Sequence, residues 1–336
     1  MGFFNFSTDI AIDLGTANTL IYTKSRGIAL SEPSIVAVDR RTRKPIAIGH
    51  EALQMHERTH KDIETIRPLK DGVIADFEVA EQLIRGLIHK LQKNWLTSIR
   101  QMVVCIPSGI TEVEKRAVRD SAEHAGAKKV YLIAEPMAAA IGIDLNVEEP
   151  VGNMIVDIGG GTTEIAVIAL SGIVVDESIR IGGDALDRAI LHYFKRCHNL
   201  LIGHRTAERI KCEIGSAIML NPELEISVIG RDMVSSIPKV RTISSEDVRE
   251  ALGDAVGQIT AAIMRCLEQT PPELGADLLE RGIMLTGGGS LLKGIAETIK
   301  NRVEMPVYVA EDPLTAVVRG TGKVLDNVSA YKQVLT

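Results

Sequence analysis

Two segments of this sequence place an aspartate two positions before a glycine, Asp13-Leu14-Gly15-Thr16 and Asp157-Ile158-Gly159-Gly160. Glycines let a backbone approach an anion closely, and successive N–H groups then form a concave nest around it. An aspartate faces a phosphate only when a cation lies between them, so the two acids indicate Mg²⁺, held through its water shell. Each segment alone is also compatible with an ordinary tight turn, but two of one design favour a phosphate site.

The residues after each turn indicate which kind of phosphate loop this is. In a dinucleotide-binding or P-loop fold, the glycine turn opens a helix whose N-terminus meets the phosphate. Here Glu164-Ile165-Ala166-Val167-Ile168 follows the second turn and alternates like a strand, and the sequence contains no GxxxxGK[ST]. Both segments are therefore predicted to be the turns of β-hairpins, with Gly15, Thr16 and Asn18 as donors in the first.

Two further groups of residues could complete a nucleotide site. Gly287-Gly288-Gly289-Ser290 lies between a predicted strand and a predicted helix. Its flat backbone surface could face the adenosine or the α-phosphate, although a simple strand-to-helix connection explains it equally well. Glu208 and Lys211 are three positions apart on one face of a predicted helix, so from the residues alone they are expected to form a surface ion pair.

The elements that must hold the two hairpins repeat along the chain. The segments Ile10–Tyr22 and Met154–Ala169 each read as an apolar strand, an Asp-x-Gly turn and a second strand. Asp13 aligns with Asp157, about 144 positions later. Self-similarity of this kind predicts an α/β fold that has been duplicated into two related lobes.

The remaining elements follow from apolar periodicity and helix signals. Strands are expected over residues 28–49, 102–106 and 130–133, and helices over residues 77–93, 111–126, 184–199, 206–219 and 244–268. A capping box at Thr111 and Glu114 marks one helix start, and Pro136 suits the first turn of another. Between residues 224 and 243, β-branched residues predict strands joined by a turn at Gly230-Arg231-Asp232.

Composition excludes several classes of protein. The chain has 336 residues, 45% of them apolar and 24% charged, which is a normal globular balance. The net charge of −6 argues against nucleic acid as a partner. The four cysteines form no CxxC pair, which predicts reduced thiols in a cytoplasmic protein. No apolar run reaches about 18 residues, so no segment is expected to span a bilayer.

Aromatic residues gather at two places that could touch a membrane surface. Phe3, Phe4 and Phe6 crowd the N-terminus, and the single tryptophan, Trp95, precedes Leu96. Exposed amphipathic and aromatic side chains suit the interface between lipid headgroups and acyl chains. The alternatives are that the phenylalanines fold back onto the body and that Trp95 packs in the core.

In their order along the chain, the motifs resemble those of the actin, Hsp70 and sugar-kinase ATPase superfamily, and within it most closely the MreB family of bacterial actins. The segments that carry this resemblance are Ile12–Thr19, Ile66–Ile74, Glu135–Gly142, Asp157–Glu164, Ala207–Lys211, Glu213–Gly215 and Leu285–Ser290. They cover the chain from about residue 8 to about residue 325. Each motif is weak alone, but together they are highly specific.

The resemblance implies an actin-like ATPase fold, with two related lobes built on ribonuclease H-like cores and a nucleotide in the cleft between them. Each lobe would carry a smaller subdomain. The implied parts are a lobe I core at 1–32, 66–144 and 315–336, its subdomain at 33–65, a lobe II core at 145–182 and 243–314, and its subdomain at 183–242.

The resemblance also assigns roles to residues. Asp13 and Asp157 would lie beside Mg²⁺, and Glu135 would position the attacking water. Glu135 and Asp157 would be the catalytic residues. The implied nucleotide contacts are Gly15, Thr16, Ala17, Asn18 and Thr19, then Gly159, Gly160, Gly161 and Thr162, then Glu208 and Lys211 against the ribose and adenine, and Gly287, Gly288, Gly289 and Ser290. This set suits phosphoryl transfer, which needs positioning and charge neutralisation. Glu135 could instead serve only as the first-turn acid of its helix.

The implied function is a cytoskeletal ATPase that hydrolyses ATP slowly, coupled to its polymerisation. The filaments would lie in the cytoplasm on the inner face of the membrane, bound by the aromatic residues, and would organise the cell-wall elongation machinery that maintains rod shape. Three alternatives stay open. A small-metabolite kinase would need an acceptor base and pocket, for which no motif is found. An Hsp70-type chaperone would need a further, peptide-binding domain. A pseudoenzyme that binds but does not hydrolyse ATP would be expected to lack Asp13, Glu135 or Asp157, all of which are present.

Overall fold

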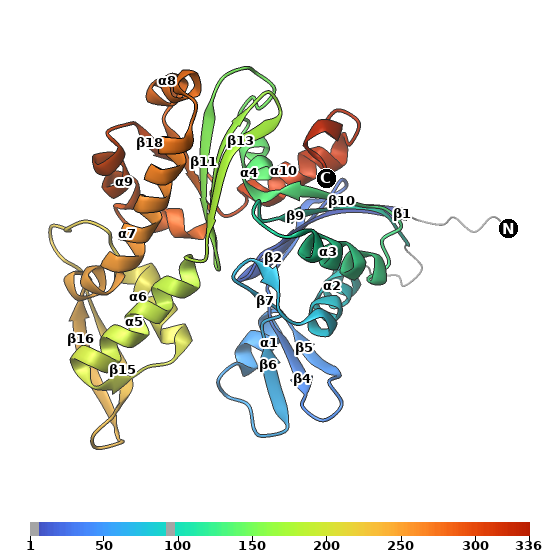
Figure 1. The fold of residues 1–336 in the computed structure, drawn as a ribbon. Helices are drawn as coiled ribbons and strands as arrows, with labels where there is room; N and C mark the ends of the chain where they lie inside the picture. The colour runs from blue at the N-terminus through green and yellow to red at the C-terminus, as the bar shows by residue number, and fades with distance from the viewer. Residues whose placement is uncertain (1–6, 92–97) are drawn as a thin grey trace.

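The computed structural model describes residues 7–91 and 98–336, and it contains two lobes that are each built on a five-stranded mixed sheet (Figure 1). The strand orders are β10-β9-β1-β2-β3 in lobe I and β13-β12-β11-β17-β18 in lobe II. In each sheet the central strand pairs antiparallel with the next strand of the chain and parallel with a much later one. The two topologies are the same, so the predicted duplication is confirmed.

The lobe I strands are β1 (Ser7–Leu14), β2 (Asn18–Thr23), β3 (Gly27–Pro33), β9 (Ser98–Ile106) and β10 (Val130–Ala134). The lobe II strands are β11 (Asn153–Ile158), β12 (Thr163–Ala169), β13 (Gly172–Ile179), β17 (Ile283–Thr286) and β18 (Val307–Val309). Every residue of β11 and β12 is buried. Their nearly continuous apolar sequence is typical of strands that are covered on both faces.

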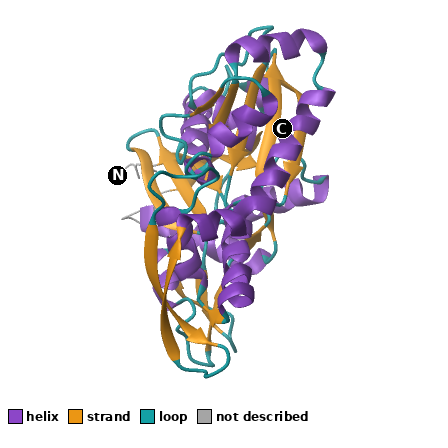
Figure 2. Ribbon diagram, turned by 90° about the vertical axis from the view of Figure 1, so that its left-hand side faces the viewer, coloured by secondary structure: helices purple, strands orange, loops and turns teal. Residues whose placement is uncertain are grey.

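Helices cover both faces of the two sheets (Figure 2). Lobe I carries α2 (Phe77–Leu91) and α3 (Glu112–His124), and lobe II carries α7 (Ser245–Gln269), α8 (Pro272–Arg281) and α9 (Ile295–Val303). Two more helices, α4 (Glu135–Gly142) and α10 (Ala316–Asp326), belong to a core that also includes Ala11 of β1 and Ile155 of β11. This third core, shared by both sheets, joins the lobes.

The crossing of α4 and α10 depends on glycine. A Cβ atom at Gly142 would overlap the carbonyl oxygen of Ala316, and one at Gly320 would overlap that of Ala138. The two helix backbones therefore approach more closely than any larger residue allows. Since α4 begins at Glu135, this crossing fixes where the predicted catalytic acid enters the space between the lobes.

Each lobe also carries a smaller three-stranded sheet, and both lie at the same end of the molecule (Figure 1). The first comprises β4 (Val36–Asp39), β5 (Pro45–Ile48) and β6 (Ile63–Ile66), beside α1 (His50–Met55). The second comprises β14 (Leu200–Leu201), β15 (Glu225–Asp232) and β16 (Pro238–Ser244), beside α5 (Gly183–His198) and α6 (His204–Ile214). A short hairpin, β7 (Leu69–Lys70) and β8 (Val73–Ile74), precedes α2, and the chain ends in a 3₁₀ turn, η2 (Lys332–Val334). The exact limits of the four predicted parts stay a prediction.

Two local predictions are corrected. The expected turn at Gly230-Arg231-Asp232 is wrong, because these residues belong to β15 and the turn follows them. A Cβ atom at Gly230 would lie 2.6 Å from Leu200 Cγ, so this glycine serves the close pairing with β14. The helix expected over 206–219 ends at Ile214, where Gly215 leaves the helical conformation. The helix start at Thr111 is confirmed, with both bonds of the capping box formed.

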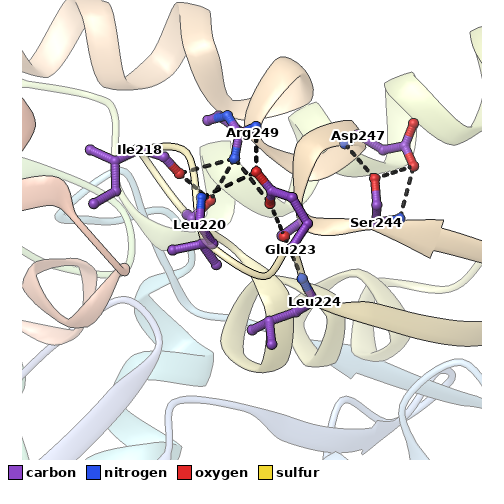
Figure 3. A network of polar contacts seen from close by, with 9 residues as sticks. Ile218, Leu220, Glu223, Leu224, Ser244, Asp247 and Arg249 are labelled. Atoms are coloured by element: carbon purple, nitrogen blue, oxygen red, sulfur yellow. Dashed lines mark hydrogen bonds and ion pairs between the residues drawn. The ribbon is translucent and has the colours of Figure 1, made fainter.

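The start of α7 shows how the small sheet of lobe II is held against its core (Figure 3). The Ser244 hydroxyl accepts from the Asp247 N–H at 3.3 Å, and the Asp247 carboxylate accepts from the Ser244 N–H at 2.8 Å. One turn later, Arg249 pairs with Glu223 at 2.9 Å. Because Glu223 also accepts from the Leu220 N–H, the loop before β15 is tied to the helix.

Candidate functional site

A cavity of about 430 Å³ lies between the two lobes, in the size range of small-molecule sites. Most of the predicted site residues line it. They are Asp13, Gly15, Thr16, Ala17, Asn18, Glu135, Asp157, Gly159, Gly160, Gly161, Thr162, Glu208, Lys211, Gly287, Gly288 and Gly289. The structure therefore brings together segments from five separate parts of the chain. Of the predicted nucleotide contacts, Thr19 and Ser290 do not line the cavity.

The first hairpin turn, residues 15–18, joins β1 to β2 and is braced from behind by Ser34. The Ser34 N–H donates to the Ala17 carbonyl at 2.9 Å, and its hydroxyl donates to the Gly15 carbonyl at 2.6 Å. Thr19 is buried and shares a 2.8 Å hydrogen bond with the Ser34 hydroxyl. Thr19 therefore supports the turn rather than facing the cavity. The turn's own carbonyls are occupied from behind, which leaves its outer surface to the cavity.

The second hairpin turn, residues 159–162, lies directly against the first. A Cβ atom at Gly160 would lie 2.6 Å from Ala17 Cβ, and one at Gly161 would lie 2.6 Å from Thr16 Oγ1. Real Cβ atoms do not approach so closely, so glycine at 160 and 161 allows the two turns to meet. The turns come from different lobes, and their distance apart therefore depends on how far the lobes are closed.

A segment that the sequence prediction missed holds the second turn from the lobe II side. The Gly183 N–H donates to the Gly159 carbonyl at 2.9 Å, and the Asp184 N–H donates to the Gly160 carbonyl at 2.8 Å. These residues begin α5, so the turn sits at a helix N-terminus after all. The helix, however, comes from later in the chain than the turn. The dipole of α5 adds positive potential where a phosphate would lie.

Lys211 does not form the expected surface pair with Glu208. Its ammonium lies 2.9 Å from the Asp187 carboxylate and 3.1 Å from the Gly183 carbonyl. The Lys211 side chain is only 16% exposed, so this contact between α6 and α5 forms inside the protein. Lys211 is thereby held beside the second turn, and Glu208 lines the cavity separately.

The third glycine turn closes the cavity from the lobe II sheet. Gly287 has φ 77°, and a Cβ atom there would overlap the Asp157 carboxylate. The short 3₁₀ turn η1 (Gly288–Leu291) follows it. Ser290 is buried, and its hydroxyl donates to the Gly287 carbonyl at 2.7 Å. Ser290 thus shapes the turn, while the glycines supply the surface that faces the cavity.

Three acids face the cavity, and burial raises the pKa of each, while repulsion from neighbouring carboxylates adds to the shift at Asp157 and Glu135. Burial raises the pKa of Asp13 to about 6, although a hydrogen bond from the Cys105 thiol at 3.2 Å opposes it. Burial and the charges of Asp13 and Glu164 raise the pKa of Asp157 to about 7. Burial, followed by the charges of Glu164, Asp13 and Asp157, raises the pKa of Glu135 well above its usual range.

This donor set fits a hydrated Mg²⁺. One Asp157 carboxylate oxygen is buried and has no hydrogen-bond partner among the described residues. Carboxylates that destabilise one another are stabilised by a cation between them. The described residues hold no cluster of three acidic, histidine or cysteine side chains that would cage a metal alone. Asp13 and Asp157 would accordingly hold the ion through its water shell and the phosphates.

The structure adds residues that the sequence prediction did not select, namely Ser34, Gly183, Asp184, Asp187 and Glu164. Two of them left a signal in the sequence. Gly182-Gly183 directly before a helix is a pattern for close backbone approach, and Glu164 is an acid within an otherwise apolar strand. Ser34 and Asp187 left none, because their importance depends on distant partners.

The predicted membrane residues Phe3, Phe4, Phe6, Trp95 and Leu96 lie outside the described residues. Among the helices that the structure does describe, none combines the length and the apolar character needed to cross a bilayer.

Comparison with known proteins places these features in a family. The family model described as MreB/Mbl protein matches residues 7–333. The chain is 50% identical over 323 residues to the cell shape-determining protein Mbl of Bacillus subtilis (strain 168), covering 96% of this chain and 97% of that protein. It is also 50% identical over 331 residues to the cell shape-determining protein MreB of Escherichia coli (strain K12), covering 97% and 95%.

A solved structure shows the same fold. The crystal structure of MreB5 of Spiroplasma citri bound to AMPPNP matches with a TM-score of 0.92 and 38% identity, covering 97% of this chain and 98% of that one. MreB5 bound to ADP matches with a TM-score of 0.91. The actin-like fold expected from the sequence motifs is thereby confirmed. With a family model over nearly its whole length and half of its residues identical to those of curated relatives, the chain belongs to the MreB/Mbl family.

Proposed function

We propose that the chain binds ATP with Mg²⁺ in the cavity between its lobes, hydrolyses it slowly and polymerises into filaments on the inner face of the cytoplasmic membrane. There the filaments would organise the cell-wall elongation machinery and so maintain rod shape. The observation that carries this proposal is the meeting of the two glycine turns, one from each lobe, beside the three acids that line the cavity, Asp13, Glu135 and Asp157. A nucleotide between such turns would hold the lobes closed.

Each group in the cavity has a part in binding. The N–H groups of turns 15–18 and 159–162 would nest the β- and γ-phosphates. Asp13 and Asp157 would hold Mg²⁺, which supplies neutralisation of phosphate charge. The MreB5 structures bound to AMPPNP and to ADP support nucleotide binding at this cleft.

The adenosine would lie between α6 and the third glycine turn. Glu208 and Lys211 line this side with polar groups, and Leu291 and Leu314 add exposed apolar surface. An apolar wall with a few polar groups is the usual environment of a bound base. The flat backbone of residues 287–289 would face the α-phosphate.

Hydrolysis would depend on Glu135. This acid begins α4, faces the cavity and would orient water toward the γ-phosphate. The raised pKa of Glu135 suits a group that receives a proton as the water reacts. The rate would be low, because Glu135 is optimally placed only when assembly has closed the lobes.

Self-assembly is supported by apolar residues at opposite ends of lobe II. The β15–β16 hairpin exposes a group that we call the hairpin patch, comprising Ile229, Met233, Val234, Ile237 and Val240. At the other end, α8 and β18 expose the end patch, comprising Leu279, Tyr308 and Val309 (Figure 1). Two different patches that bury one another between copies make an open, filament-forming contact. Exposed groups of this kind mark interaction surfaces.

The family match argues against the small-metabolite kinase. It covers residues 7–333, and the named relatives are called cell shape-determining proteins.

The central experiment is electron microscopy of the purified protein with Mg·ATP and liposomes, together with a measurement of the rate of phosphate release. Filaments on the liposomes with slow phosphate release are expected, and Asp157→Asn should abolish both. Monomers that phosphorylate a sugar would contradict the proposal.

A further inference from the structure

One buried acid beside the cavity has no part in the proposed function. Glu164 lies on β12, directly opposite Asp157 in the antiparallel register, and is 1% exposed. It does not line the cavity. A lone acid buried in an apolar strand costs stability unless donors compensate it, so its contacts show what it does.

The Glu164 carboxylate is shared between the two lobes. One oxygen accepts from the Ser108 hydroxyl at 3.0 Å and from the Ser108 N–H at 3.3 Å. The other oxygen accepts from the Ser178 hydroxyl at 2.7 Å. Ser108 lies between β9 and α3 of lobe I, whereas Glu164 and Ser178 belong to the lobe II sheet. Glu164 is therefore a polar contact between the lobes.

The surroundings of this contact are tightly packed on both sides. A Cβ atom at Gly72 would lie 3.0 Å from Pro107 Cγ and 3.0 Å from Thr162 Cγ2, so lobe I surrounds the end of the second turn. A Cβ atom at Gly109 would lie 3.4 Å from Ser178 Cβ. With so little free space, a relative movement of the lobes has to separate Ser108 from Glu164.

The choice of an acid at position 164 is informative. Replacing a buried charge by an apolar residue of similar size is often neutral or stabilising, so stability alone does not explain it. A carboxyl group has two oxygens, so Glu164 accepts from Ser108 and Ser178 at the same time. Burial raises the pKa of Glu164, and these hydrogen bonds oppose that shift. After burial, the charge of Glu164 is also the largest contribution to the raised pKa of Glu135. Glu164 therefore belongs to the same group of interacting acids as Glu135.

We propose that Glu164 is a positioning residue that couples lobe closure to hydrolysis. When the lobes close on a nucleotide, Ser108 donates its hydrogen bonds to the Glu164 carboxylate. This fixes β12 and the second turn, with Thr162, against the Glu135 side of the cavity. Without the contact between Ser108 and Glu164 the nucleotide still binds, but the second turn and Glu135 are no longer held in a fixed position relative to each other. This inference rests on the proposed ATPase function and adds Glu164 as the residue that links closure of the lobes to hydrolysis.

The test compares Glu164→Ala and Glu164→Gln with the wild type. We expect Glu164→Ala to bind AMPPNP with a Kd within threefold of the wild type and to hydrolyse Mg·ATP at least tenfold more slowly. Glu164→Gln keeps an oxygen that can accept from Ser108, so it should recover part of the rate. The chain also offers a matched control in Glu223, which accepts from the Ser245 hydroxyl and the Leu220 N–H entirely within lobe II. Glu223→Gln should lower Tm but keep the rate.

Hydrogen exchange supplies a readout that does not depend on hydrolysis. In the wild type, AMPPNP should slow amide exchange over residues 107–111, and in Glu164→Ala this protection should be lost. Unchanged protection, or a wild-type rate in a variant with only a lowered Tm, would overturn the proposal. If the wild type itself does not hydrolyse ATP, the proposed function fails, and the exchange result alone then decides the coupling. Should Glu164→Ala not fold, Ser108→Ala should show the same loss to a smaller extent.

Discussion

At the scale of residues, the cavity is defined by acids that are costly to keep together. Asp13, Glu135 and Asp157 face one space with raised pKa values, and one oxygen of Asp157 has no hydrogen-bond partner among the described residues. Such groups are stable together only with a cation or with shared protons. The repulsion among these acids is thus one reason to expect that a cation such as Mg²⁺ would stabilise the site.

The role of Glu135 can be measured directly. Glu135→Ala should lower the rate of phosphate release by about 10²- to 10⁴-fold, the usual contribution of a group that positions or deprotonates water. Nucleotide affinity should change little, because the phosphate nests consist of backbone groups. Phosphate release at the wild-type rate would remove Glu135 from the mechanism. Isothermal titration with AMPPNP is the control for binding.

The raised pKa values predict how pH changes stability without metal and nucleotide. Unfolded aspartates titrate near 3.8, whereas Asp13 and Asp157 titrate near 6 and 7 in the folded protein. Between these values the folded state holds more protons, so these groups make stability fall as pH rises from about 4 to about 7. Asp157→Asn mimics the protonated form and should therefore raise Tm relative to the wild type.

This gain from Asp157→Asn should be a few degrees at pH 8, since about 1 kcal/mol shifts Tm by roughly 2 °C in a chain of this size. At pH 5 the gain should be smaller, because pH 5 lies closer to the unfolded pKa of Asp157 than to its folded pKa, and less of the loss of stability has occurred. Thermal melts in EDTA at both pH values provide the measurement. An equal Tm difference at pH 5 and pH 8 would show that Asp157 does not titrate in this range.

At the scale of elements, the site depends on two hairpins meeting tip to tip. The contact between Gly160 and Ala17 leaves no room for a further carbon atom, and α5 supports the second turn from behind. The turns themselves are short and local, but their approach is set by the shared core around α4 and α10. Closure of the cavity is therefore a property of packed elements rather than of the loops alone.

A single methyl group should separate the hairpins. Gly160→Ala places a Cβ atom 2.6 Å from Ala17 Cβ, so the turns must move apart and AMPPNP affinity should fall at least tenfold. The matched control is Gly257→Ala on α7, where a Cβ atom would meet nothing within 4 Å. That change should stabilise the helix by up to about 1 kcal/mol and leave binding unchanged. Wild-type affinity in Gly160→Ala would show that the turns do not need this contact.

At the scale of the whole molecule, the proposed function requires many copies. One lobe II presents the hairpin patch at one end and the end patch at the other (Figure 1). Neither patch belongs to any of the hydrophobic cores of the described residues. Side chains left apolar at opposite ends suit a molecule that is covered by its neighbours in a filament.

The hairpin patch offers a test of assembly. Val234 is 86% exposed, so Val234→Asp should leave the monomer folded while placing a charge in the contact between copies. We expect the critical concentration for pelleting with Mg·ATP to rise at least tenfold. Val113→Asp is the control, because Val113 is 79% exposed on α3 and belongs to neither patch. Equal pelleting of both variants would show that the hairpin patch does not mediate assembly.

Membrane binding should also depend on assembly. Each molecule would contribute only a few aromatic side chains, so single copies should bind weakly and filaments should bind through avidity. A variant combining Phe3→Ser, Phe4→Ser, Phe6→Ser, Trp95→Ala and Leu96→Ser should lose co-sedimentation with liposomes. Its polymerisation in solution should persist. Full pelleting of this variant with liposomes would rule out these residues as the anchor.

The sequence by itself determined the local features: the two hairpins, their duplication, the capping box at Thr111 and the family to which the motifs belong. The hairpins and the capping box depend on residues within one turn or one strand pair, where backbone preference and apolar pattern are sufficient. The duplication and the family follow from comparing such short motifs along the chain. The misplaced turn at Gly230 is the informative exception. That glycine serves a neighbouring strand, and a partner distant in sequence leaves no local signal.

Only the tertiary structure decided which residues face the cavity and which support it. Thr19 and Ser290 carry the right chemistry in the right motifs, yet both point into the protein and brace their turns. Lys211 pairs with Asp187 rather than with Glu208, because the packing of α6 on α5 brings the Asp187 carboxylate close to its ammonium. The contact between Ser108 and Glu164 likewise exists only because the fold sets Ser108 against β12. Side-chain direction and contacts between lobes arise from packing over long sequence separations, which no local pattern contains.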